Sequence, residues 1–186
     1  MKKILLYAFI IMAAAQWFVP VQMLWSRHRV LNQGELFKFR TRPIDPADPF
    51  KGRFVSLSFD DETVFVKNGS AFHYEQDVYL ILGTTAGGHA KIEKVFHHVP
   101  SGGRNYLKAK VNYASKENDS LWALALNFPF DEYYMNEFKA PQAEKMYRDS
   151  SRLNGDTYAK VKIYNGTGVL EGVYINDRRI EDLITQ

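Results

Sequence analysis

The sequence contains no cysteine among its 186 residues. This absence excludes disulfides, cysteine-based metal sites and thiol catalysis. The sequence also lacks the GxSxG elbow of serine hydrolases and any phosphate-binding glycine pattern, and its five histidines are scattered. Although the formal net charge is +3, there is no long basic run and no nucleic-acid-binding motif. We therefore predict no nucleic-acid partner, no cofactor, no metal site and no small-molecule ligand.

Charge is also absent from residues 4–25. About 20 apolar residues are enough for one helix to cross the hydrocarbon layer of a membrane. We therefore predict a single-pass signal anchor with its flank over residues 1–30. Residues 31–186 would then form one soluble domain of ordinary size.

The anchor has an alternative reading as a cleaved signal peptide, because Ala13, Ala14 and Ala15 resemble a cleavage site. The apolar run continues well past these alanines, which favours an uncleaved anchor in the cell membrane. Lys2 and Lys3 favour a cytoplasmic N-terminus, whereas the basic residues that follow the run oppose it. The layout at the N-terminus leads us to place the soluble domain outside the cytoplasm, in the periplasm or the extracellular space.

The rest of the chain shows the period-2 alternation of strands, and aromatic residues, which favour strands, make up 15% of the full sequence. One helix is indicated at 141–153, where Pro141 suits the first turn and Asn154-Gly155 suits the end. These patterns predict a mainly β domain, an antiparallel barrel or sandwich of about eight strands with one helix. The predicted strands are 36–42, 53–59, 77–84, 91–99, 106–113, 121–128, 157–164 and 169–175.

An unusual segment lies between the first two predicted strands, where Asp45 and Asp48 each precede a proline. A residue before proline is held in an extended conformation. The two carboxylates could form a site for a cation or for acid–base work. The more ordinary interpretation is a rigid turn, in which each carboxylate accepts hydrogen bonds from nearby backbone amides.

This region resembles the GDYXXLXY family of small, membrane-anchored bacterial proteins. Residues 43–50 read PIDPADPF, similar to the family's PVDPRDPFRG, and residues 52–59 read GRFVSLSF in place of the name-giving motif. Residues 130–137 and Glu144 resemble later family positions, so the likeness covers nearly the whole soluble domain. The resemblance implies a protein often encoded beside multi-spanning membrane proteins, and it implies no assigned activity.

The motif departs from the family pattern in its chemistry. Arg53 replaces the motif's aspartate, and Phe54 and Phe59 replace its two tyrosines. A mechanism that needs that carboxylate or those hydroxyls could not operate here, whereas a glycine turn and aromatic packing persist. We therefore predict a structural rather than a functional role for the turn and the motif: Asp45, Asp48, Gly52, Phe54, Leu57 and Phe59.

Two further groups of residues are candidates for contacts. Tyrosines beside acids at Tyr133, Tyr134, Glu137 and Glu144 could form a partner surface or a half-buried face. A basic group follows the apolar run and could contact anionic lipid or form the solvent face of a strand. Its members are Arg27, Arg29, Lys38, Arg40 and Arg42.

These observations assign no catalytic residue. Our leading hypothesis is an uncharacterised, non-enzymatic accessory protein that binds an integral membrane protein. The alternative is a membrane-tethered hydrolase that uses Asp45 and Asp48, or a Ser-Lys pair such as Ser56 or Ser58 with Lys51 or Lys67. A second alternative is a domain that binds anionic lipid.

Overall fold

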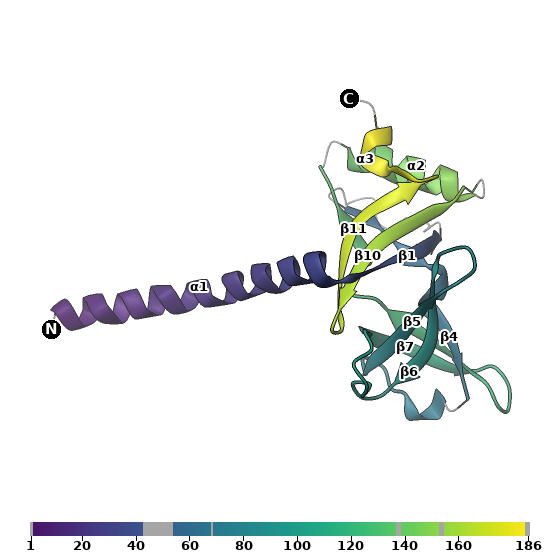
Figure 1. The fold of residues 1–186 in the computed structure, drawn as a ribbon, viewed down its shortest axis with the longest axis horizontal. Coiled ribbons are helices and arrows are strands. Elements are labelled where there is room, and N and C mark those ends of the chain that lie inside the picture. The colour runs from purple at the N-terminus through teal and green to yellow at the C-terminus, as the bar shows by residue number, and fades with distance from the viewer. Residues whose placement is uncertain (1, 43–53, 68, 137–138, 153–154, 185–186) are drawn as a thin grey trace.

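The computed structural model describes residues 2–42, 54–67, 69–136, 139–152 and 155–184. A long N-terminal helix leads into a β domain that is built from two sheets, with short helices at the end nearest the C-terminus (Figure 1).

The N-terminal helix, α1, spans Lys2–Gln33 and therefore runs past residue 30, where the anchor and its flank were expected to end. Its last turn is attached to the β domain. Val30 is only 2% exposed, and the Lys162 ammonium donates a hydrogen bond to the Leu31 carbonyl at 2.6 Å. Within the described ranges, no helix meets the combined length and hydropathy expected of a membrane span.

The first sheet has the strand order β12-β11-β10-β1-β3, and all of its pairs are antiparallel. The alternation predicted for 36–42 is present in β1, where Phe37, Phe39 and Thr41 are buried. This strand joins the two halves of the sheet because it pairs with both β10 and β3. The strands are β1 (Glu35–Arg42), β3 (Ser58–Phe59), β10 (Thr157–Tyr164), β11 (Thr167–Ile175) and β12 (Arg178–Arg179).

The second sheet has the order β4-β8-β7-β5-β6 and is also antiparallel, and a two-stranded ribbon pairs β2 with β9. The strands are β2 (Phe54–Ser56), β4 (Thr63–Val66), β5 (Asp77–Thr84), β6 (Ala90–Phe96), β7 (Leu107–Lys116), β8 (Trp122–Asn127) and β9 (Glu132–Tyr134). The remaining helices are η1 (Asp60–Glu62), η2 (Gly69–Ala71), α2 (Ala140–Arg152) and α3 (Ile180–Leu183).

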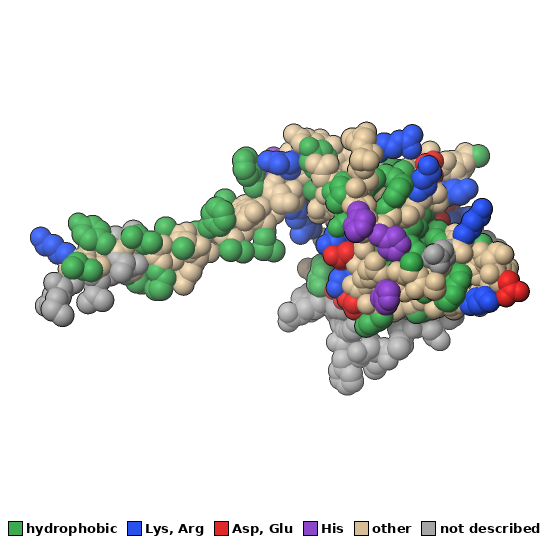
Figure 2. All heavy atoms as spheres, turned by 90° about the horizontal axis from the view of Figure 1, so that it is seen from below, with side chains coloured by type: hydrophobic (Ala, Val, Ile, Leu, Met, Phe, Trp, Pro, Cys, Tyr) green, Lys and Arg blue, Asp and Glu red, His purple; other side chains and the backbone are tan. Residues whose placement is uncertain are grey.

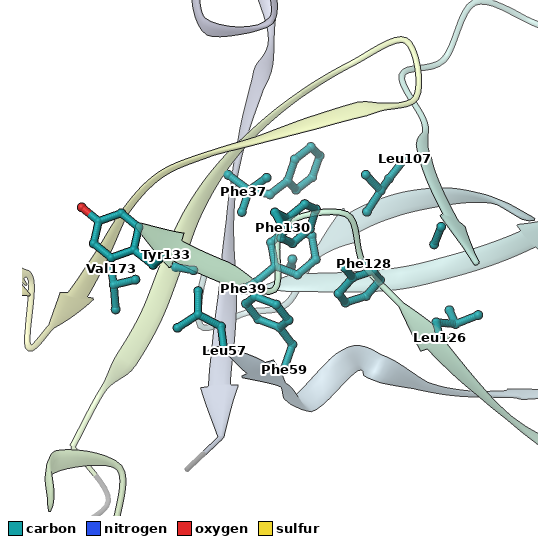
Figure 3. Packing of buried hydrophobic residues seen from close by; sticks show 14 of the residues in the cluster. Phe37, Phe39, Leu57, Phe59, Leu107, Leu126, Phe128, Phe130, Tyr133 and Val173 are labelled. Carbon is teal, nitrogen blue, oxygen red and sulfur yellow. The ribbon is translucent and has the colours of Figure 1, made fainter. Parts of the chain in front are cut away.

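One hydrophobic core joins the two sheets, since Val161 of the first and Leu80 of the second belong to the same buried cluster. Aromatic rings fill its centre (Figure 3). The Phe39 ring lies 5.8, 5.5 and 5.2 Å from the rings of Phe59, Phe128 and Phe130. Such edge-on and tilted contacts stabilise aromatic clusters beyond the area that they bury.

The prediction of a mainly antiparallel β domain is confirmed, but two of its details are wrong. The described residues form twelve strands rather than about eight, and α3 accompanies the expected helix near residue 141. The extra strands β4, β9 and β12 are short. The predicted strand 53–59 is divided at Leu57, because the Leu57 amide donates to the Asp131 carbonyl at 2.7 Å and turns the chain from β2 into β3.

Candidate functional site

A cavity of about 430 Å³ lies where β1 ends and the altered motif enters the first sheet. We call it the motif cavity. Apolar side chains and polar groups both line it: Arg42, Leu57, Ser58, Glu62, Asn127, Phe128 and Asp131. Two motif positions, Leu57 and Ser58, therefore contribute directly to its wall.

The polar groups on one side of the motif cavity bond to one another. Glu62 accepts hydrogen bonds from the Ser58 hydroxyl at 2.8 Å, from the Arg42 guanidinium at 3.0 Å and from the Phe59 amide at 3.0 Å. The Arg42 guanidinium also donates to the Ser58 hydroxyl at 3.4 Å and lies 3.9 Å from Asp60. Because it accepts these three hydrogen bonds, the Glu62 carboxylate fixes the η1 turn against β1, which is a structural role.

The backbone of Arg42 is held from the other side by α2. The Tyr147 hydroxyl donates to the Arg42 carbonyl at 2.6 Å, and its ring is 2% exposed. Burial raises the pKa of Tyr147 to about 12. The end of β1 is therefore fixed by a buried, neutral phenol.

Two motif side chains, Leu57 and Phe59, point into the core. Leu57 is 3% exposed and Phe59 is completely buried, and both lie beside the aromatic rings in Figure 3. Phe54 pairs with Tyr134 in the ribbon of β2 and β9, and its side chain is not described. Asp45, Asp48 and Gly52 lie outside the described residues, so their predicted role in a turn stays a prediction.

The hydrolase alternative uses either Asp45 and Asp48 or a serine beside a lysine. The described partners of the Ser58 hydroxyl are Glu62 and Arg42, and neither is a lysine. Lys51, like Asp45 and Asp48, lies outside the described residues. Histidines gather on the face of the β domain that Figure 2 presents, but no three His, Asp or Glu side chains within the described parts of the chain are arranged to hold a metal.

Of the two interpretations left open for Tyr133, burial favours the buried face over the partner surface, because this side chain is 7% exposed and belongs to the core. Its hydroxyl bonds to Glu181 of α3, and the Arg179 guanidinium donates to it at 3.3 Å. Burial, followed by the bond to Glu181, raises the pKa of Tyr133 to about 12. Tyr134 is 68% exposed and donates to Glu132 at 2.5 Å. Glu137 and the side chain of Glu144 are not described.

The basic group is divided between two elements. Arg27 and Arg29 lie in α1, and Arg29 lies over the Trp25 ring at 5.2 Å from its centroid. Lys38, Arg40 and Arg42 alternate with the buried residues of β1 and form its outward face, as the strand interpretation predicted. Arg42 is paired with Glu62 at the far end of that strand.

Pairing of β1 with β10, and of β10 with β11, builds a surface that the sequence alone did not indicate. Lys38 lies opposite Lys160, Arg40 opposite Tyr158, and Tyr158 opposite Tyr174. We call this surface the tyrosine–lysine face and define it as Lys38, Arg40, Lys160 and Tyr174, which lie around Tyr158, a side chain that is itself 0% exposed. The alternation in 157–164 placed Lys160 on the polar side of its strand, but only the register reveals its neighbours.

Comparison with known proteins identifies one family. A family model described as GDYXXLXY protein matches residues 16–173, which is most of the chain. Neither the curated proteins nor the solved structures contain a significant match.

Proposed function

The chain belongs to the GDYXXLXY family, and we propose that it is a non-enzymatic accessory protein. Residues 4–25 of α1 would attach it to the cell membrane, and the β domain would bind an integral membrane protein. The domain would lie outside the cytoplasm, an orientation supported by Lys2 and Lys3 at the N-terminus.

The surface of α1 is the observation that carries this proposal. Apolar side chains follow the helix along its length (Figure 2), and the helix projects away from the β domain (Figure 1). Exposed apolar surface on this scale marks contact with a membrane or with another protein. The large apolar side chains that are more than half exposed include Ile4, Leu6, Phe9, Ile11, Trp17, Phe18, Leu24 and Trp25.

Two features at the end of the apolar run agree with an interface. Trp25 suits the boundary between hydrocarbon and head groups, and Arg27 and Arg29 follow within one turn. Basic residues near an anionic membrane surface contribute about 1 kcal/mol each. Contact with anionic lipid is therefore assigned to these two arginines rather than to the whole basic group.

The motif supports a non-enzymatic role. Leu57 and Phe59 pack in the core, and the hydroxyl of Ser58 is bonded to Glu62. The replacements Arg53, Phe54 and Phe59 remove the carboxylate and hydroxyls of the family motif. Leu57 and Phe59 therefore serve the domain by packing, and Ser58 is part of a fixed turn.

Membrane attachment is tested by fractionation of cells that produce the full chain. We expect the protein to stay with alkali-washed membranes. The double variant Ile11→Asp, Val19→Asp should move to the supernatant, because a charge near the bilayer centre costs about 2.5–3.5 kcal/mol. Ile11→Ala with Val19→Ala is the matched control and should stay in the membrane. A wild-type protein found in the supernatant would contradict the attachment.

The accessory role is tested by purification from mild detergent. We expect an integral membrane protein to co-purify reproducibly with the full chain, and a reproducibly solitary protein would contradict this role. The orientation is tested separately by adding protease to intact spheroplasts, which should digest the β domain without lysis.

A further inference from the structure

We propose that the tyrosine–lysine face binds an extended, acidic segment of a partner protein. This inference rests on the accessory function proposed above, and it names the surface that would recognise the partner and the chemistry of the contact.

The register of the first sheet concentrates positive charge on this face. Lys38 and Lys160 lie directly opposite each other on neighbouring strands, and Arg40 is the next outward residue of β1. Like charges directly opposite on one face of a sheet destabilise the pairing. Their presence here indicates a surface that is arranged for an outside anion rather than for stability alone.

Two stacked tyrosines hold the lysines in place. The Tyr158 and Tyr174 rings are 5.5 Å apart and nearly parallel at 5°. The Lys38 ammonium lies 4.7 Å from the Tyr158 centroid, and the Lys160 ammonium lies 4.0 Å from the Tyr174 centroid. A cation over a ring face is positioned without losing its charge. Both ammonium groups therefore keep donors for a ligand.

One carboxylate balances part of this charge. Asp177 accepts a hydrogen bond from the Tyr158 hydroxyl at 2.5 Å and lies 3.7 Å from the Lys38 ammonium. It occupies the two-residue turn between β11 and β12, where Asn176 and Asp177 adopt φ values of 49° and 63°. Asn and Asp tolerate the positive φ that such hairpin turns require. The turn thus directs Asp177 back to the face.

The remaining cations are available. Arg40 is exposed, and no acid in the described part of the chain forms an ion pair with it. Lys160 contacts the ring of Tyr174. Among the described acids, Asp177 alone forms an ion pair with these three cations, which leaves an excess of positive charge beside the partly exposed Tyr174 ring.

The spacing of the cations suits an extended peptide. Lys38 and Arg40 are two residues apart on one strand, which places them about 6.8 Å apart along the sheet. An extended peptide with an acid at every second residue repeats the same distance on one of its sides. Each such carboxylate can therefore meet one cation.

The position of the face favours a protein over lipid head groups. The strands lead away from α1 (Figure 1), and Arg40 is five residues beyond the start of β1 at Glu35, about 17 Å along the strand. That distance exceeds the Debye length of about 8 Å at physiological ionic strength. Head groups at the end of α1 would therefore act weakly on the face.

The test uses the full chain in non-ionic detergent and a fluorescent octapeptide of alternating Glu and Ser as the probe, read by anisotropy. We expect saturable binding that weakens as salt rises. Arg40→Glu with Lys160→Glu should raise the Kd at least tenfold. The matched control is Lys94→Glu with Lys145→Glu, which makes the same charge change at exposed sites on β6 and α2 and should keep the Kd within twofold.

Three results would overturn the inference: no binding by the wild-type chain, an equal loss in the control variant, or binding to anionic vesicles but not to the peptide. If circular dichroism shows that the double variant does not fold, Arg40→Gln alone should still raise the Kd at least threefold. The peptide assay needs no native partner. A full chain that purifies alone would contradict the accessory function, whereas a peptide-binding failure contradicts this inference.

Discussion

The two faces of β1 differ in what their side chains do. Phe37 and Phe39 point inward to the aromatic core and are at most 5% exposed, whereas Lys38 and Arg40 point outward among tyrosines and other cations. Leu57 and Phe59 of the altered motif are buried in the same core as the inward face of β1. The comparison shows that Leu57 and Phe59 of the motif pack in the core, while the face that we propose for recognition lies on the opposite side of the same strand.

The two faces should differ most in how much a leucine-to-alanine substitution lowers the free energy of unfolding. Leu57→Ala should lower the free energy of unfolding by about 2–5 kcal/mol, because it removes a buried side chain and leaves a cavity. Leu36→Ala, at a 45% exposed position of β1, is the control and should change it by less than about 0.5 kcal/mol. Urea unfolding followed by tryptophan fluorescence measures both. Similar losses in the two variants would remove the distinction.

Phe59→Tyr restores a hydroxyl at the motif's last aromatic position and sharpens the structural interpretation. The described rings around Phe59 are those of Phe39, Phe128 and Phe130, which offer no hydrogen-bond acceptor of their own. An unpaired buried hydroxyl costs about 1–3 kcal/mol in proteins. Urea titration of Phe59→Tyr should show a free energy of unfolding that is lower by that amount. An increase would show that a hydrogen-bond partner for the new hydroxyl lies nearby.

Alkaline pH should weaken the fold through the buried phenols on the inward side. The unfolded Tyr147 phenol ionises near its ordinary pKa of 10, whereas burial raises the folded value to about 12. The stabilising contribution is complete below pH 10 and is lost as pH rises through 12, by up to about 3 kcal/mol. Tyr147→Phe should show a shallower decline between pH 9 and 11 than the wild-type chain. If the stability of both proteins declines identically with pH, ionisation of Tyr147 does not cause the loss of stability.

The smallest loss of folding stability is expected for a substitution at the rim of the motif cavity. Glu62→Gln keeps the shape of the side chain but removes the charge that Arg42 faces at 3.0 Å. Because both side chains are partly exposed, the loss should be about 1 kcal/mol. Glu117→Gln, at an exposed position, is the control. A loss of several kcal/mol would show that the rim contributes as much as the aromatic core.

Much of the fold could be predicted from periodicity alone. The limits of β5 and β10 coincide with predicted strands, and α2 begins within one residue of the predicted helix. The strands β4, β9 and β12 were missed because two to four residues carry too little alternation to be distinguished from loop. Their existence depends on partners far along the chain, as β9 depends on β2.

The sequence predicted on which side of a strand some candidate residues lie, but not which residues they contact. The outward position of Lys38 and Arg40 followed from alternation, whereas the lysine opposite Lys38 is set by the register between β1 and β10. The burial of Tyr133 depends on Glu181, which is 48 residues away in the sequence. Sequence spacing gives the side of a strand to which a residue points, and tertiary pairing decides what it meets there.

The most direct test compares two adjacent residues of β1, Phe39 and Arg40, by the free energy of unfolding of Phe39→Ala and Arg40→Ala in urea. We expect Phe39→Ala to lose about 3–5 kcal/mol, because its ring is completely buried among three others. Arg40→Ala should stay within about 0.5 kcal/mol of the wild-type chain. Comparable losses in both variants would contradict the assignment of the inward face to stability and of the outward face to recognition.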